Sequence, residues 1–217
     1  PAGAVVSMHW SRVALPAALF IAASALYVCT AAPGTLFGDP SEYQFVPAIA
    51  GIAHPPGYAV YTLLARTWQF LLPLGTVAYR TNLLSAFLGA TTVTLVYLTG
   101  VDLLSVRTRQ AALVGAALAA ASLAVAPDFW QHSIHANSHI LSATLAMVHL
   151  WLLVRWWRTG SDRWLGGFAF VLGLSAVHHP VTLLGAPAYT AFILVTKPNL
   201  LRRWRALLAL AGLVLAG

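Results

Sequence analysis

The chain has little charge. Of its 217 residues only 8% are charged, whereas 59% are hydrophobic and the mean hydropathy is +0.78. Soluble domains carry roughly 25% charged residues, so this chain has too few to cover a water-facing surface. It also has a single cysteine, Cys29, which excludes a disulfide scaffold. These shortages exclude an ordinary cytosolic enzyme and a disordered chain, and they leave a polytopic membrane protein.

The uncharged stretches predict an all-α, polytopic transmembrane helical bundle. We expect a single module over residues 1–217 with about seven spans: 13–32, 81–101, 110–126, 134–154, 164–177, 181–196 and 204–217. The stretch 164–196 is too long for one crossing, and His178-His179-Pro180 supplies a break within it. Because Gly217 ends the sequence inside an apolar run, we expect the last span to be truncated and to continue in a longer chain.

The basic residues predict the orientation of these spans. Only Arg66 and Arg80 fall on one side, and the other ten Lys and Arg residues share the opposite side: Arg12, Arg107, Arg109, Arg155, Arg158, Arg163, Lys197, Arg202, Arg203 and Arg205. The positive-inside rule makes the side with ten cations cytoplasmic. The net charge of +7 therefore reflects orientation in a lipid bilayer, and we expect no nucleic-acid partner. A nucleic-acid or anionic-lipid site over 197–205 is the alternative.

Residues 33–79 form a long loop on the outer side. Its apolar segment 59–72 is too short to span a bilayer and predicts an amphipathic helix in the outer interface. Asp39 and Glu42 share one helix face if Pro40 begins a helix. Asp39 would then be the N-cap, which satisfies free backbone donors. The functional interpretation of the same residue is a general base or a metal ligand.

Three histidines and an aspartate predict a second feature of the outer face. Asp128, His132, His135 and His139 lie on one face of a helix that begins near Asp128. Such a face is typical of a zinc or manganese site. The alternative is a polar helix end that lines a wet cavity.

Three more outer residues are candidates for phosphate binding. His178 and His179 either donate to a phosphate oxygen or satisfy carbonyls freed by Pro180. Arg80 is unusual because nearly all other cations lie inside. A lipid phosphate or a substrate phosphate is the natural partner for its guanidinium.

Five stretches carry a resemblance to a known family: Gly38-Asp39-Pro40-Ser41-Glu42-Tyr43, Gly51-Ile52-Ala53-His54-Pro55-Pro56-Gly57-Tyr58, Leu72-Pro73-Leu74-Gly75, Arg80-Thr81-Asn82-Leu83-Leu84-Ser85-Ala86 and Phe129-Trp130. They resemble the GT-C membrane glycosyltransferases, and most closely a family whose animal member is a protein O-mannosyltransferase. The resemblance extends from the first span to about Ala188. It implies transfer of a sugar from a polyprenyl-phosphate donor to an acceptor at the outer (periplasmic or extracytoplasmic) face of an inner or plasma membrane. Residues 33–79 would be the outer catalytic loop.

The resemblance also implies residue roles. Asp39 would deprotonate an acceptor hydroxyl or organise a metal, with Glu42 in support. Five further residues would bind substrate, the first two around the acceptor and sugar and the last three at the lipid phosphate: His54, Tyr58, Arg80, His178 and His179. A divalent metal, Mg²⁺ or Mn²⁺, is left open as a cofactor, and the acceptor is a protein, a lipid or a glycan.

The chain departs from that family at one position. Family members carry a Glu in an Ala-Glu-Val-Tyr stretch after Phe-Trp, where this chain has Ala136-Asn137-Ser138-His139. Asp128 or the nearby histidines compensate, or this homologue differs in donor, metal dependence or activity. Two other functions stay open: a transporter or channel, whose acids should lie near the membrane midplane, and a non-catalytic membrane assembly subunit.

Overall fold

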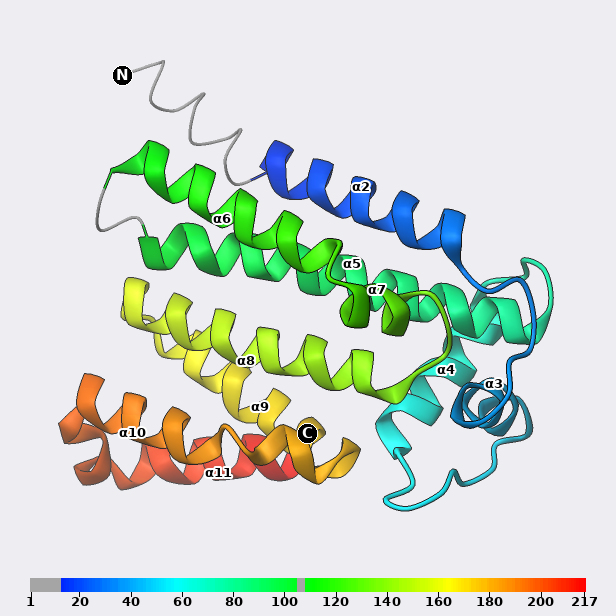
Figure 1. Ribbon diagram of the computed structural model, residues 1–217. Helices are drawn as coiled ribbons and strands as arrows, with labels where there is room; N and C mark the ends of the chain where they lie inside the picture. The colour runs from blue at the N-terminus through cyan, green and yellow to red at the C-terminus, as the bar shows by residue number, and fades with distance from the viewer. Residues whose placement is uncertain (1–12, 105–107) are drawn as a thin grey trace.

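A computed structural model of the chain describes residues 13–104 and 108–217, so Arg12 and Arg107 lie outside the described part. The described residues form helices and no strands. At the centre, α5 (Val77–Leu104) packs against α2 (Leu15–Thr30), α6 (Arg109–Ala124) and α8 (Ser138–Thr159), as Figure 1 shows. On its other side α8 packs against α9 (Asp162–His178), which contacts α11 (Trp204–Ala216). The expected all-α bundle is confirmed.

Small residues allow α5 and α6 to pack closely. The buried face of α6 is alanine at every fourth position: Ala112, Ala116, Ala120 and Ala124. A Cβ added at Gly100 of α5 would lie 2.9 Å from the Cβ of Ala116, so the two backbones need glycine there. Small residues at such interfaces are the usual way for membrane helices to approach one another.

Short helices gather at one end of the bundle and carry most of the outer residues. They are α3 (Asp39–Ile49), α4 (Ala59–Leu71) and α7 (Pro127–Ser133), which lie near the first turns of α5 and α8 (Figure 1). The helix expected over 59–72 is thus present as α4. The expected break at His178-His179-Pro180 is also present, because α9 ends at His178 and the 3-10 helix η2 (Pro180–Leu183) begins two residues later.

The number of spans is lower than expected. Each predicted span contains a helix, but among the described residues only α5 and α8 are long and apolar enough to cross a membrane. The pair α6 and α7, bent by 66°, gives a third if it is counted as one span. The prediction of seven was wrong because α2, α9, α10 (Ala186–Thr196) and α11 have 16, 17, 11 and 13 residues. At 1.5 Å per residue they fall short of a hydrocarbon core of about 30 Å.

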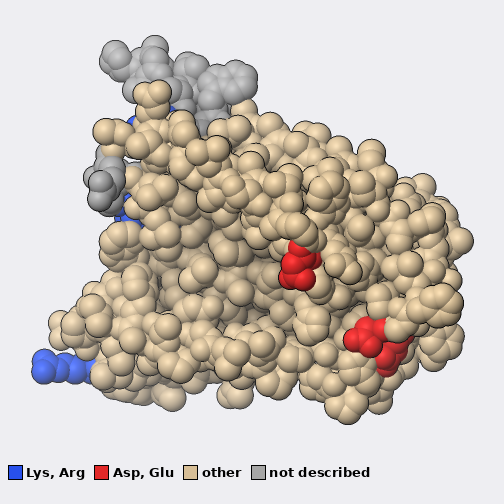
Figure 2. All heavy atoms as spheres, viewed as in Figure 1, with Lys and Arg blue, Asp and Glu red and all other residues tan. Residues whose placement is uncertain are grey.

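Charged residues separate along the bundle. In the view of Figure 2 the visible basic side chains lie at one end, and the visible acidic ones lie toward the middle and the other end. At the basic end, Asp162 of α9 accepts from Lys197 at 2.7 Å, next to the 3-10 helix η3 (Pro198–Arg202). Arg155 of α8 meets the buried Asp102 of α5 at 3.3 Å. The acids at the basic end, Asp102 and Asp162, therefore pair with cations there, and the other three acids lie away from that end.

Candidate active site

A bidentate contact joins α3 to the loop that follows it. Glu42, in the first turn of α3, accepts from the backbone N–H of His54 through Oε1 and from the ring Nδ1 through Oε2, both at 2.7 Å. The hydrogen bond to the His54 ring is the main reason why the pKa of Glu42 is lowered. The pKa of His54 is raised, mainly by the same bond. Since a carboxylate only accepts, the proton lies on Nδ1, and Nε2 of His54 faces away from Glu42.

Asp39 is placed differently from the prediction. It is the first residue of α3, and the N-cap is Gly38, whose φ of +75° suits glycine. No side chain caps this helix; instead the N–H and hydroxyl of Ser41 both donate to the carbonyl of Gly38. The N-cap interpretation of Asp39 was therefore wrong. Its exposed carboxylate has no hydrogen-bond or ion-pair partner within 13–104 and 108–217, and its charge contributes, after Glu42, to the raised pKa of His54.

The buried side chain of Tyr58 packs beside the ring of His54. Tyr58 precedes α4 with a φ of +49°, which is rare for a bulky residue, and it is 4% exposed. Its ring centroid lies 5.4 Å from His54, 5.3 Å from Tyr43 and 5.3 Å from His179, with the His179 ring nearly parallel to it. Burial is the first cause of a raised pKa at Tyr43. Tyr58 thus connects the pair formed by Glu42 and His54 to the end of α9.

His178, the last residue of α9, and His179, which follows it, have different surroundings. His178 is fully buried, and its Nε2 lies 3.2 Å from both the carbonyl of Ser138 and the hydroxyl of Ser142. It therefore ties α9 to α8. The Nδ1 of His179 accepts from the N–H of Val181 at 3.0 Å, in the turn that Pro180 begins. This bond leaves the proton of a neutral His179 on Nε2, as a donor for an incoming oxygen.

The predicted metal face does not form one helix surface. α7 ends at Ser133 and α8 begins at Ser138, so Asp128 and His132 lie on one helix and His139 on the next. The Asp128 carboxylate is 95% exposed, and the Nδ1 of His132 lies 2.8 Å from the backbone carbonyl of Asp128. In the described part of the chain no group of three or more His, Cys, Asp or Glu residues could hold a metal ion. The residues present do not fit the predicted metal site.

Two histidines of that set, His132 and His139, nevertheless lie in a row of rings that continues from His179. His139 lies 5.9 Å from His179 and 6.4 Å from His132, measured between ring centroids. Asp128, His132 and His139 line a pocket of about 380 Å³ between α7 and α8. The alternative interpretation, a polar helix end lining a cavity, matches this arrangement. His135 lies beside His132, with centroids 6.1 Å apart, and burial lowers its pKa.

Asn82 connects the segments that carry these residues, and the sequence analysis gave it no role. It is fully buried in α5. Its Oδ1 accepts from Gln44 of α3 and from the backbone N–H of Ala136, and its Nδ2 donates to the carbonyls of Ala32 and Gly34. The signal was an amide near the start of a predicted span, since a buried amide needs several partners.

Asn137, where the departure from the family lies, has a structural role. It is the N-cap of α8, and its side chain accepts from the N–H of His139 at 2.7 Å. The position therefore sets the start of the helix that carries His139.

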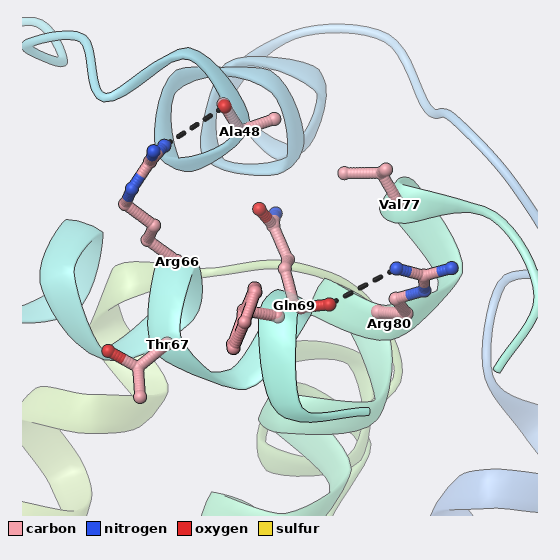
Figure 3. A pocket seen from close by; sticks show the side chains of 7 residues that line it. Ala48, Arg66, Thr67, Gln69, Val77 and Arg80 are labelled. Carbon is pink, nitrogen blue, oxygen red and sulfur yellow. Dashed lines mark hydrogen bonds between the residues drawn. The ribbon is translucent and has the colours of Figure 1, made fainter. Parts of the chain in front are cut away.

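Arg80 lies away from the histidines. Its guanidinium donates to the carbonyls of Gln69, in the last turn of α4, and Gly75. Tyr58 stands at the other end of α4, so about 16 Å of helix separates the two positions. Arg80 thus contacts one end of α4, whereas His179 stacks on Tyr58 at the other end, and the expectation that Arg80, His178 and His179 face one phosphate stays a prediction. Figure 3 shows Arg80 and Arg66 on either side of Gln69.

Comparison with known proteins matches residues 39–202 to the family model described as the Protein O-mannosyl-transferase TMEM260 N-terminal domain. The chain belongs to this family. The matched part of this TMEM260 N-terminal domain begins at Asp39 and includes every candidate site residue described above. No solved structure matches it significantly.

Two curated relatives carry the name protein O-mannosyl-transferase TMEM260. The domain is 33% identical over 138 residues to the one from Mus musculus, which covers 64% of this chain and 19% of the relative. It is 25% identical over 191 residues to the one from Dictyostelium discoideum, which covers 80% of this chain and 23% of the relative. The chain thus spans about a fifth of the length of the curated relatives it matches.

Proposed function

We propose that this TMEM260-family domain is the catalytic part of a GT-C-like glycosyltransferase. It would move a sugar, mannose being the first candidate from the names of the relatives, from a polyprenyl-phosphate donor to an acceptor hydroxyl. The observation that carries the proposal is the exposed carboxylate of Asp39, which has no partner in the described part of the chain. It stands one helical turn from Glu42, whose own carboxylate is fully engaged by His54.

The chemistry divides between two sides of the site. Asp39 accepts the proton of the acceptor hydroxyl while the oxygen of that hydroxyl forms a bond to the anomeric carbon. The bond from that carbon to the phosphate oxygen breaks, and its electron pair leaves with the polyprenyl phosphate. A single displacement of this kind inverts the anomeric carbon. A positioned base contributes typically 10²–10⁴-fold, and the Nε2–H of His179 is a donor for the developing negative charge.

The remaining residues position this chemistry. Glu42 holds the His54 ring at 2.7 Å, and His54 and Tyr58 present an aromatic wall against which a sugar face can pack. His178 is anchored by Ser138 and Ser142, and it holds the end of α9 so that His179 stays against Tyr58. No step requires a metal at Asp128, His132, His135 and His139.

The membrane location follows from the donor. A polyprenyl-phosphate sugar is held in the bilayer, and α5 and α8 are apolar enough to lie there. We place the site at the outer face of an inner or plasma membrane, because ten of the twelve basic residues belong to the opposite side. Asp39 and Glu42 lie in the short helix α3, which is not among the candidate spans of the described residues, and this argues against an ion path through the membrane.

The test uses the full-length protein in membranes with a panel of radiolabelled polyprenyl-phosphate sugars. Asp39→Asn should lower transfer by about 10²–10⁴-fold. Asp162→Asn is the matched control, because Asp162 is also an exposed aspartate in the first turn of a helix, at the basic end of the bundle. Full transfer by Asp39→Asn would disprove the role of Asp39. His54→Gln and Asp128→Asn, measured in parallel, would then show which other group accepts the proton. If wild-type membranes transferred no sugar but carried an ion or solute flux, the proposed glycosyltransferase activity would be disproved.

A further inference from the structure

The two outer arginines line one pocket. A pocket of about 420 Å³ lies between the end of α3, the end of α4 and the start of α5. Arg66 and Arg80 stand on opposite sides of it, with the amide of Gln69 between them (Figure 3). These are the two cations that the sequence places on the side opposite the other ten.

The hydrogen bonds to nearby backbone carbonyls use only some of the N–H donors of Arg66 and Arg80. The NH1 of Arg66 donates to the carbonyls of Pro47 and Ala48, and Arg80 donates to those of Gln69 and Gly75. A guanidinium has five N–H donors, so several remain on each side chain. The Nε of Arg80 is buried with no partner in the described residues. Neither arginine pairs with a carboxylate in that part of the chain, so two positive charges face the pocket uncompensated.

The surroundings of the pocket are apolar on both sides. A hollow of about 300 Å³ adjoins it through Ala48 and Val77, and Phe45 lines this hollow. A second hollow of about 390 Å³ meets it at Arg66, lined mainly by apolar residues such as Ile52 and Leu63. Phe70, on the wall of the central pocket, is 86% exposed. A cationic centre between two apolar hollows fits a phosphate that carries two hydrocarbon chains.

We propose that this pocket binds the phosphate headgroup of an anionic two-chain phospholipid of the outer leaflet, at a site separate from the sugar-transfer site. Arg66 and Arg80 would each donate charge-assisted hydrogen bonds to the phosphate oxygens. The two hollows would receive the acyl chains. A polyprenyl phosphate has one chain and so would fill only one of them. Along α4, Arg66 and Gln69 of this pocket lie about 12 and 16 Å from Tyr58. Only the second hollow reaches the segment around Tyr58, through Pro56 and Gly57.

The test measures retained lipid and does not depend on sugar transfer. The full-length protein would be placed in nanodiscs of phosphatidylcholine with and without phosphatidylglycerol, extracted, and its bound lipid counted by native mass spectrometry. Arg66→Gln and Arg80→Gln should each reduce retained phosphatidylglycerol about tenfold, the effect of one charge-assisted bond. Arg202→Gln, which removes an exposed charge elsewhere, should leave it unchanged.

A second variant guards against misfolding. Ala48→Phe fills the junction of the pocket and the first hollow from an exposed position while both arginines are kept, and it should reduce retention as well. An equal loss in Arg202→Gln would disprove the site in favour of general surface charge. Displacement of the lipid by inorganic phosphate alone would show an anion site without chain recognition, and would also overturn the proposal. So would arginine variants that lose polyprenyl phosphate but keep phosphatidylglycerol, because the pocket would then belong to the donor.

Discussion

Replacing Asn82 by alanine should loosen the whole outer end of the domain. The side chain is fully buried and makes four hydrogen bonds, at 2.8 to 3.3 Å, to three separate segments. Those segments are the loop after α2, helix α3, and the turn between α7 and α8. Because α3 carries Asp39 and Glu42, the substitution changes their placement without touching either residue.

The size of the destabilisation depends on which hydrogen-bond partners of Asn82 are left without a bond. Gln44 keeps a 3.2 Å bond to the carbonyl of Gly34, so its amide is not orphaned. The N–H of Ala136, a residue with no exposed surface, loses its partner; such a group costs about 1–3 kcal/mol. Loss of the bonds to Ala32 and Gly34 adds about 1 kcal/mol each. We therefore expect Asn82→Ala to lower the free energy of unfolding by about 3–5 kcal/mol.

The assay is thermal unfolding of the purified full-length protein in one detergent, followed by intrinsic tryptophan fluorescence, together with sugar transfer on the same samples. Asn199→Ala is the control, because Asn199 is exposed on η3 and such surface changes stay within about 0.5 kcal/mol. An unfolding midpoint for Asn82→Ala equal to that of the control would refute the reasoning. Reduced transfer at unchanged stability would instead assign Asn82 a direct role in the site.

Two further predictions concern pH and close packing. Contact lowers the pKa of Glu42 and raises that of His54, so the pair stabilises the 50–58 loop most between about pH 4.3 and 6.5, the ordinary values of the two groups. Stability should fall below this range as Glu42 protonates and above it as His54 deprotonates, and Glu42→Gln should flatten the unfolding midpoint against pH. Gly89→Ala should destabilise by about 1–3 kcal/mol, because its Cβ would lie 2.8 Å from the Cβ of Ser133. Gly212→Ala meets open space and should not; equal midpoints would contradict the packing argument.

Much of the helix content could be predicted from the chain alone. Runs without charge bounded by arginine, proline or glycine predicted α4 to within one residue at each end, and α5 and α8 to within five residues at each end. The N-cap of α3 was harder to predict. Aspartate is a preferred N-cap residue, but Gly38 occupies the N-cap position before Asp39, with a positive φ. Backbone conformation at one glycine decides whether the carboxylate is consumed by capping or left for chemistry.

Distances between helices could not be predicted. The four-residue face from Asp128 to His139 assumed one continuous helix, and the break between Ser133 and Ser138 divides it. The hydrogen-bond partners of His54 and Asn82 come from other segments, at separations such as 12 residues for Glu42 and 54 for Ala136. So does Tyr58, whose ring stacks on His179. Periodicity describes one helix at a time, so it cannot report such contacts.

The sequence by itself determined the class of this protein, because hydropathy, the shortage of charge and the placement of cations act residue by residue and need no partner. It also marked which polar side chains were out of place in an apolar chain. Only the tertiary structure decided how these side chains divide: His54, Tyr58 and His179 together beside α3, and Arg66 with Arg80 at the far end of α4. That division depends on the packing of α3, α4, α5 and α9 against one another, and packing is a property of the whole bundle.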